Sequence, residues 1–147
     1  MAKYLLDTNI LLRMADERAP QHLLAGETVS ILLARRNEVY ITAQNLIEFW
    51  AVATRPLEAN GFGWSTPQTV AELEQIRNRF PLLADTPEIV TRWLTLVTDH
   101  DIKGKKVHDA RLVAVMQVHG VTQLLTFNTD DFKGYPNITL LHPDDVA

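Results

Sequence analysis

The sequence contains no cysteine, which excludes disulfide bonds, cysteine-ligated zinc and thiol catalysis. No apolar run approaches the ~20 residues that a membrane span requires, and the first residues do not resemble a signal peptide. Neither a GxxxxGK[ST] nor a GxGxxG phosphate-binding loop occurs. We therefore expect a cytoplasmic protein that has no membrane partner and uses neither thiol nor phosphate-loop chemistry.

An excess of basic residues is also missing. Fourteen Lys and Arg residues face 18 Asp and Glu residues, and the formal net charge is -4. Proteins that coat nucleic acid are usually basic, so any contact with nucleic acid must be local or assisted by metal ions. The length of 147 residues, 46% hydrophobic and 22% charged, suits one globular domain over residues 1–147 and is too short for two ordinary ones.

Short apolar runs alternate with helical patterns along the chain. Strands are predicted at 3–6, 39–42, 121–127 and 138–141, and helices at 10–14, 19–36, 43–54, 67–80, 88–100 and 107–119. Residues 55–66 are expected to form a mobile loop, and residues 81–85 an extended link. Alternating strands and helices are typical of a parallel sheet with right-handed crossovers, so the predicted fold class is α/β.

Asp7 ends the first apolar run, in the turn between a strand and a helix that Thr8 and Asn9 open. The ends of parallel strands open onto a crevice where ligand chemistry collects. Two interpretations of Asp7 alone are open. It either caps the helix or is the first of several acidic groups around a divalent metal.

Two further carboxylates lie in apolar surroundings. Glu48 is on the helix that follows the second strand, and Asp109 is in the first turn of the most apolar helix. A carboxylate there is costly to desolvate unless it is paired or bound to metal. Simpler interpretations are that Glu48 reaches solvent or pairs with Arg55, and that Asp109 favours the positive end of its helix dipole. The interpretation of these acids as one metal site is strengthened because the starts of their helices should all face the same edge of the sheet.

A last polar group follows the third strand at the same edge. It consists of Asn128, Asp130 and Asp131, of which Asp130 is typical of a solvated turn residue. Carboxylates gathered in one pocket repel each other, and a hard divalent cation relieves the repulsion. Mg²⁺ prefers carboxylate and water oxygens, and such sites suit phosphodiester cleavage by an activated water.

The chain resembles the PIN-domain nucleases, and most of all the VapC-type toxins of bacterial and archaeal toxin–antitoxin systems. The resemblance covers essentially the whole chain and four motif regions in family order: 5–9 (LLDTN), Glu48 in its apolar helix, 107–110 (VHDA) and 124–132 (LLTFNTDDF). It implies a PIN-like α/β/α sandwich with a central, mainly parallel sheet. It also implies an endoribonuclease that depends on Mg²⁺ or Mn²⁺, forms a homodimer and is held inactive by a cognate antitoxin encoded beside it.

Carried over residue by residue, the resemblance makes Asp7 and Asp109 the main metal ligands and Glu48 a third acid that binds metal or orients water. The fourth position departs from the family pattern. Many relatives have an Asp shortly after the Thr of the last motif, and in this chain Asn128 is close to that position. Asp131 is the alternative acid. This departure leaves open whether one metal ion or two are bound.

Cationic side chains are expected to bind RNA phosphates beside the site. The candidates are Lys105, Lys106 and Arg111, which flank Asp109, and Arg55. Lys103 is also nearby in the sequence, but we favour a role as an ordinary solvated loop residue for it. Aromatic residues of the 55–66 loop would either stack on a base or cover a dimer or antitoxin surface, and we favour the covering role. These residues are Phe62 and Trp64. A general-base role for His108 is not favoured, because metal already supplies an activated water.

Two other classes of function compete with the nuclease. The first is an RNA-binding or partner-binding module that kept the fold and lost catalysis, which Asn128 favours weakly and the three acids oppose. The second is a phosphatase of similar α/β shape. Dehalogenase-like phosphatases need a DxD after the first strand, and this chain has Asp7-Thr8-Asn9 there.

Overall fold

A single parallel sheet forms the centre of the computed structural model, which describes residues 2–146. The five strands found there have the order β3-β2-β1-β4-β5. Their bounds are β1 (Lys3–Leu6), β2 (Glu38–Thr42), β3 (Leu82–Leu83), β4 (Gln123–Leu125) and β5 (Thr139–Leu141). The predicted parallel sheet is confirmed.

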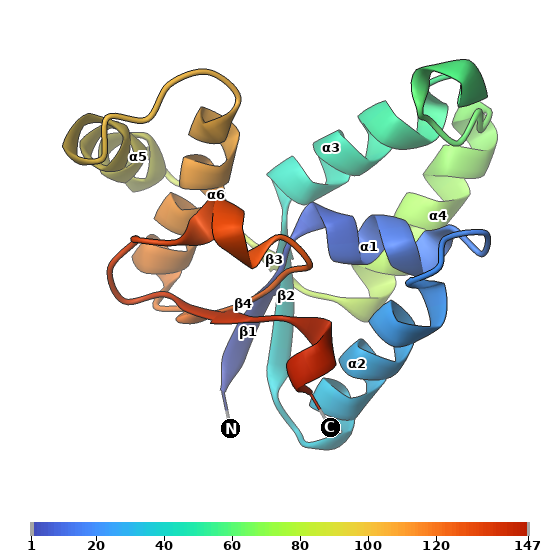
Figure 1. Cartoon of the computed structure of the whole chain (residues 1–147), viewed down its shortest axis with the longest axis horizontal. Helices are drawn as coiled ribbons and strands as arrows, with labels where there is room; N and C mark the ends of the chain where they lie inside the picture. The colour runs from blue at the N-terminus through green and yellow to red at the C-terminus, as the bar shows by residue number, and fades with distance from the viewer. Residues whose placement is uncertain (1, 147) are drawn as a thin grey trace.

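Helices cover both faces of the sheet (Figure 1). The helices are α1 (Thr8–Ala15), α2 (His22–Ala34), α3 (Ala43–Thr54), α4 (Thr66–Arg79), α5 (Pro87–Asp99) and α6 (Lys106–His119). Short 3-10 turns are η1 (Leu57–Ala59), η2 (Thr129–Phe132) and η3 (Pro143–Asp145). Over residues 2–146, none of the helices has the length and apolar character to cross a membrane.

Alternation along the central strands creates two separate cores. Leu5 and Leu124 face the core beneath α5 and α6, whereas Leu6 and Leu125 face the core beneath α1 to α4. All four side chains are fully buried. Strands covered on both faces are apolar at successive positions, which explains the continuous apolar runs of the sequence. The fold is thus an α/β/α sandwich.

The carboxyl ends of β1, β2 and β4 lie side by side at one edge of the sheet. Leu5 pairs with Tyr40 on one side and with Leu124 on the other. Each strand is followed within a residue or two by a polar side chain, Asp7 after β1, Thr42 at the end of β2 and Thr126 after β4. The backbone N–H of Asp7 donates to the carbonyl of Leu125 at 2.9 Å, which locks β1 to β4 there.

Residues 81–85 were expected to be an extended link, and the structure adds a strand pairing that was not predicted. Leu82 and Leu83 form the edge strand β3, which pairs with Ile41 and Thr42 of β2. Two paired residues, one of them 39% exposed, give too short an alternation to signal a strand. The third predicted strand, 121–127, shortens to β4, and the other three predicted strands and the helices lie close to their predicted places.

The 55–66 segment, predicted as a loop, is anchored to α3 by ring packing and backbone hydrogen bonds. The rings of Phe62 and Trp64 pack on the buried ring of Phe49, with centroids 6.4 and 6.0 Å away. Their backbone N–H groups donate to carbonyls at the end of α3, which lack partners inside the helix. Both rings therefore complete the core beneath α3 and α4 instead of standing out to stack on a base.

Gly61 is the position on which this anchoring depends. A Cβ there would overlap the carbonyl oxygen and Cβ of Arg55, whereas Gly26 in α2 has nothing within 4 Å of its added Cβ. We expect Gly61→Ala to lower the free energy of unfolding by about 1–3 kcal/mol through overpacking. Gly26→Ala, the matched control, should raise it by about 0.5–1 kcal/mol through helix propensity. Urea denaturation measures both, and equal stability of the two variants would contradict the packing described.

Candidate active site

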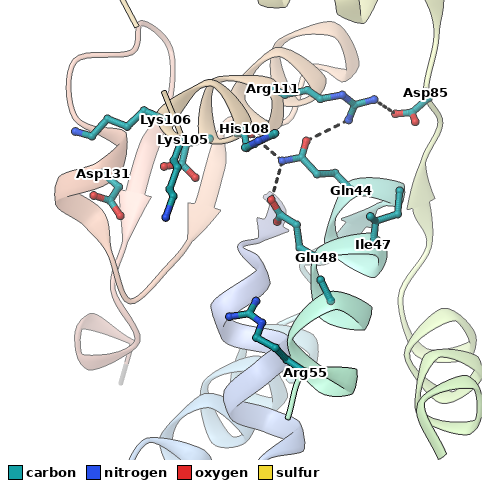
Figure 2. A pocket seen from close by; sticks show the side chains of 12 residues that line it. Gln44, Ile47, Glu48, Arg55, Asp85, Lys105, Lys106, His108, Arg111 and Asp131 are labelled. Atoms are coloured by element: carbon teal, nitrogen blue, oxygen red, sulfur yellow. Dashed lines mark hydrogen bonds and ion pairs between the residues drawn. The ribbon is translucent and has the colours of Figure 1, made fainter. Parts of the chain in front are cut away.

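A cleft of about 850 Å³ opens at the polar edge of the sheet, between α3 and the start of α6. Side chains of α3 form one wall, and the lysines of α6 with the loop after β4 form the opposite wall (Figure 2). The lining residues are Gln44, Ile47, Glu48, Ala51, Arg55, Asp85, Lys105, Lys106, His108, Asp109, Arg111 and Asp131. Most of the predicted site residues are therefore brought together in one place.

Asp7 is not one of the lining residues and is 8% exposed, but it is joined to the cleft through Thr8, whose hydroxyl donates to Glu48. Its Oδ1 accepts from the N–H of Thr8 at 2.8 Å, which caps α1, and its Oδ2 accepts from the hydroxyl of Thr126 at 2.7 Å. The pKa of Asp7 is raised to about 6, mainly by burial and to a smaller extent by the charges of Glu48 and Asp131. The two hydrogen bonds act in the opposite direction and lower it. The capping interpretation is thus correct, and it leaves the second lone pair of each oxygen for another ligand.

Asp109 is half-buried in the first turn of α6 and lines the cleft. Its pKa is raised to about 7, first by burial and then by the charges of Asp7, Asp131 and Glu48. Lys106 acts in the opposite direction. Three acids that are far apart in sequence thus lie close enough to Asp109 to raise its pKa.

Glu48 projects from α3 into the same cleft with both oxygens engaged. Oε1 accepts from the hydroxyl of Thr8, and Oε2 accepts from the side-chain amide of Gln44 at 3.1 Å. The hydroxyl of Thr8 in turn accepts from Asn45 at 2.9 Å. The expected alternative partner, Arg55, lines the cleft but does not take either of these two hydrogen-bonding places. Glu48 is therefore a pre-oriented carboxylate.

The group after β4 separates into three different environments. Asp131 lines the cleft and raises the pKa of both Asp7 and Asp109. Asn128 is exposed, and its backbone N–H donates to the hydroxyl of Thr126 at 2.9 Å. Asp130 is exposed and pairs with Lys133 at 2.6 Å, which lowers its pKa and agrees with a solvated turn residue. Geometry therefore favours Asp131 over its two neighbours.

The predicted cationic residues also divide. Lys105, Lys106 and Arg55 are exposed on the walls of the cleft. Lys103 lies outside it and pairs with Asp101 at 3.5 Å, both side chains being more than 80% exposed. The guanidinium of Arg111 is held 3.2 Å from Asp85 and 3.2 Å from the amide oxygen of Gln44.

Four polar residues that support the acids were not identified from the sequence. Each is nearly or fully buried at the end of a strand or in the first turn of the next helix, and they are Thr8, Gln44, Asn45 and Thr126. The signal that identified Asp7, a polar side chain directly after an apolar strand, applies to them too. Burying a neutral side chain costs much less than burying a charge, so a neutral residue after an apolar strand does not by itself require a partner or a ligand. The sequence pattern alone therefore did not single out these four residues.

The donor chemistry of the cleft suits a hard divalent cation. Among the residues that the structure describes, no three His, Asp or Glu side chains converge tightly enough to form a ready-made cage. Mg²⁺ does not require one, because it keeps several waters and is commonly held by one or two carboxylates. Asp7 and Asp109, whose charges oppose one another at the floor of the cleft, fit that mode of binding.

The raised pKa of Asp109 makes stability depend on pH. The folded protein holds this proton up to about pH 7, whereas the unfolded chain loses it near 3.8, so the free energy of unfolding falls as pH rises between these values. We expect Asp109→Asn to remove this loss. After allowance for solvent screening of a half-exposed group, the variant should be about 1–2 kcal/mol more stable at pH 8 without metal.

The same variant should come within about 0.5 kcal/mol of the natural protein at pH 4, where both folded side chains are uncharged and Asp109 of the unfolded chain is only partly ionised. Chemical denaturation in EDTA at the two pH values measures the difference. A stability difference that does not change with pH would show that Asp109 is not held in an unfavourable charge environment.

Comparisons with known proteins find relatives and solved structures that are similar to this chain. Ribonuclease VapC24 of Mycobacterium tuberculosis is 28% identical over 138 residues, covering 88% of this chain and 89% of that protein. The solved structure of VapBC2 from Rickettsia felis, bound to a DNA fragment from its promoter, matches with a TM-score of 0.70 at 21% identity, covering 95% of this chain and 98% of that one. Mycobacterium tuberculosis VapC20, a sarcin-ricin loop cleaving toxin, matches with a TM-score of 0.61 at 17% identity, covering 92% and 98%.

The two structural matches show a shared fold, in agreement with the sandwich and sheet described above. A family model described as PIN domain matches residues 4–137, which is most of the chain and includes every acid of the cleft. This chain therefore belongs to the PIN domain family.

Proposed function

We propose that this PIN-domain chain is a divalent-metal-dependent endoribonuclease and the toxin of a toxin–antitoxin pair. The observation that supports the proposal is that Glu48 and Asp109 line one cleft and that Asp7 is linked to it through Thr8, which donates to Glu48. The pKa values of Asp7 and Asp109 are both raised. The relatives support the reaction class, since VapC24 is named a ribonuclease and VapC20 a toxin that cleaves the sarcin-ricin loop.

In this proposal Asp7 and Asp109 hold Mg²⁺ or Mn²⁺, and Asp131 completes the acidic set in place of Asn128. The bound ion would lower the pKa of an attacking water and stabilise charge on the phosphate. Glu48, held by Thr8 and Gln44, presents a fixed acceptor that orients this water. Asp7 is itself fixed by its bonds to Thr8 and Thr126, so it needs little reorganisation to bind.

RNA phosphates would lie along the cleft wall that carries Lys105 and Lys106, with Arg55 on the opposite side (Figure 2). Local positive charge of this kind allows an acidic protein, with a net charge of -4, to hold a polyanion. Contacts to phosphates position the strand without reading its sequence. The three side chains therefore account for binding near the acids and not for the choice of RNA.

Cleavage of RNA tests the proposal directly. We expect the purified protein to cut a mixture of tRNA and rRNA with Mg²⁺ or Mn²⁺ and to stop in EDTA. Asp7→Asn and Asp109→Ala should each lower the rate by more than about 100-fold, beyond the 10–100-fold typical of residues behind metal ligands. Gel electrophoresis of end-labelled RNA measures the rates, and circular dichroism checks that each variant is folded.

A matched pair of neighbours serves as the control. Asp131→Asn should slow cleavage because Asp131 lines the cleft, whereas Asp130→Asn, whose side chain pairs with Lys133 outside it, should not. Full activity in folded Asp109→Ala would contradict the site. A natural protein that folds and binds Mn²⁺ but cuts no RNA would instead be a partner-binding or RNA-binding module that kept the fold.

Two protein partners belong to the proposal, an antitoxin and a second copy of the chain. Exposed apolar side chains on α5, Val90 at 61% and Leu94 at 58%, lie one helical turn apart and support a protein contact. We expect the product of a small reading frame beside this gene to form a complex with the protein and abolish RNA cleavage. Light scattering gives the mass of each species, and unchanged cleavage in the presence of that product would contradict an antitoxin role.

A further inference from the structure

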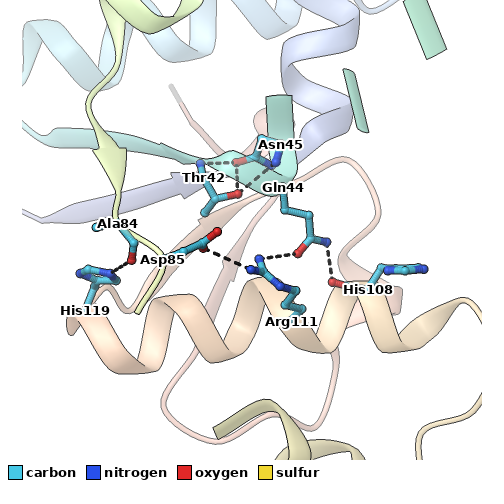
Figure 3. Close-up of polar contacts among 8 residues, drawn as sticks. All are labelled: Thr42, Gln44, Asn45, Ala84, Asp85, His108, Arg111 and His119. Carbon is cyan, nitrogen blue, oxygen red and sulfur yellow. Dashed lines mark hydrogen bonds and ion pairs between the residues drawn. The ribbon is translucent and has the colours of Figure 1, made fainter. Parts of the chain in front are cut away.

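Gln44 joins the start of α3 to the start of α6 through its side-chain amide (Figure 3). Its Nε2 donates to the carboxylate of Glu48 at 3.1 Å and to the backbone carbonyl of His108 at 2.8 Å. Its Oε1 accepts from Arg111 at 3.2 Å. The side chain is 8% exposed and comes from the helix that carries Glu48, while the bonded peptide of His108 directly precedes Asp109.

The neighbours of this amide allow one orientation. A carboxylate and a backbone carbonyl only accept hydrogen bonds, so the NH₂ group has to face Glu48 and His108. A guanidinium only donates, so the oxygen has to face Arg111. Rotating the amide by half a turn would set oxygen against two oxygens and NH₂ against a cation. Three partners therefore determine the direction in which Gln44 points its donor.

Arg111 is itself held in place from the far side. Its second terminal nitrogen lies 3.2 Å from Asp85, the residue two positions after β3, while the first contacts Gln44. A planar guanidinium that bridges two acceptors has to break one of these contacts to turn toward a phosphate. This arrangement differs from the RNA-binding role expected for Arg111 and places it behind Gln44.

The other oxygen of Glu48 is fixed independently. Thr8 donates to it, and Asn45 donates to Thr8. Asn45 is in turn bonded to Thr42 through the capping box of α3 (Figure 3). These residues belong to the β1–α1 and β2–α3 junctions, so their bonds do not connect Glu48 to α6. Among the contacts described for Glu48, the bond from Gln44 is the one that connects it to α6, because Gln44 also bonds the carbonyl of His108 next to Asp109.

We propose that Gln44, backed by Arg111 and Asp85, is a positioning residue of the nuclease site: it orients Glu48 and sets the spacing between the acids of α3 and α6. The inference rests on the metal-dependent activity proposed above. Metal affinity then depends on a side chain that does not itself touch the metal. Arg111 acts through Gln44 and not through the RNA.

The test uses side chains of similar length that cannot form these hydrogen bonds. We expect Gln44→Met to weaken Mn²⁺ binding by about 10–100-fold, as is usual for residues behind metal ligands. Arg111→Met should weaken it less, and the double variant should bind no more weakly than Gln44→Met, because both changes break the same chain of bonds. Electron paramagnetic resonance of free Mn²⁺ measures affinity, and thermal unfolding confirms that each variant is folded.

Matched controls and RNA kinetics separate positioning from substrate binding. Gln68→Met on α4 and Arg92→Met on α5, both exposed, should leave Mn²⁺ affinity unchanged. At saturating Mn²⁺ the KM for RNA should be the same in Arg111→Met as in the natural protein. A raised KM with unchanged Mn²⁺ affinity would overturn the inference, since it would make Arg111 a phosphate ligand. Unchanged Mn²⁺ affinity in folded Gln44→Met would overturn it too.

A measurement on the metal-free protein keeps this inference distinct from the proposed function. The side-chain NH₂ signals of Gln44, identified by their loss in Gln44→Met, should shift in Arg111→Met and stay in place in Arg92→Met. NH₂ signals that do not respond to Arg111→Met would show that Arg111 does not hold Gln44, and this would overturn the inference even in an active nuclease. Absence of Mn²⁺ binding by the natural protein would overturn the proposed function. The NH₂ signals alone would then decide whether Arg111 holds Gln44 in place.

Discussion

The crowding of carboxylates at one edge of a parallel sheet is the constraint on which the rest of this structure depends. Burial and mutual repulsion raise the pKa of Asp7 to about 6 and that of Asp109 to about 7, so at neutral pH the metal-free fold carries unfavourable charge. The fold retains the acids because the neighbouring backbone is strongly determined. Leu5 and Leu6 are fully buried in the two cores, and β1 is paired on both sides.

Neutral polar residues are what make this crowding tolerable. Thr126 donates to Asp7, Thr8 and Gln44 donate to Glu48, and each of these donors is nearly or fully buried. They lie at junctions between strands and helices, where backbone groups already need partners. Side chains that finish one strand or begin one helix thereby also hold a carboxylate from a different part of the chain. Local folding and assembly of the site are the same event.

The sequence predicted the charged part of this site and missed its neutral part. Asp7 and Asp109 were identifiable because a carboxylate in an apolar run requires an explanation, whereas Gln44 in the same kind of run does not. The strand β3 was missed because two residues cannot show a period, and the anchoring of Phe62 and Trp64 was missed because it depends on packing against Phe49 across a turn. The direction of Arg111 was equally out of reach, since its partner Asp85 follows a strand that the pattern did not reveal.

The hydrogen bond that caps α1 has a consequence for how the proposed nuclease could be controlled. One oxygen of Asp7 is bonded to the first turn of that helix and the other to Thr126, so the carboxylate cannot swing aside without losing the helix cap and the bond to the loop after β4. A switch inside the domain that moved Asp7 away from the cleft would therefore cost part of the stability of α1. A partner that covered the cleft of the proposed nuclease could block it while leaving these bonds in place.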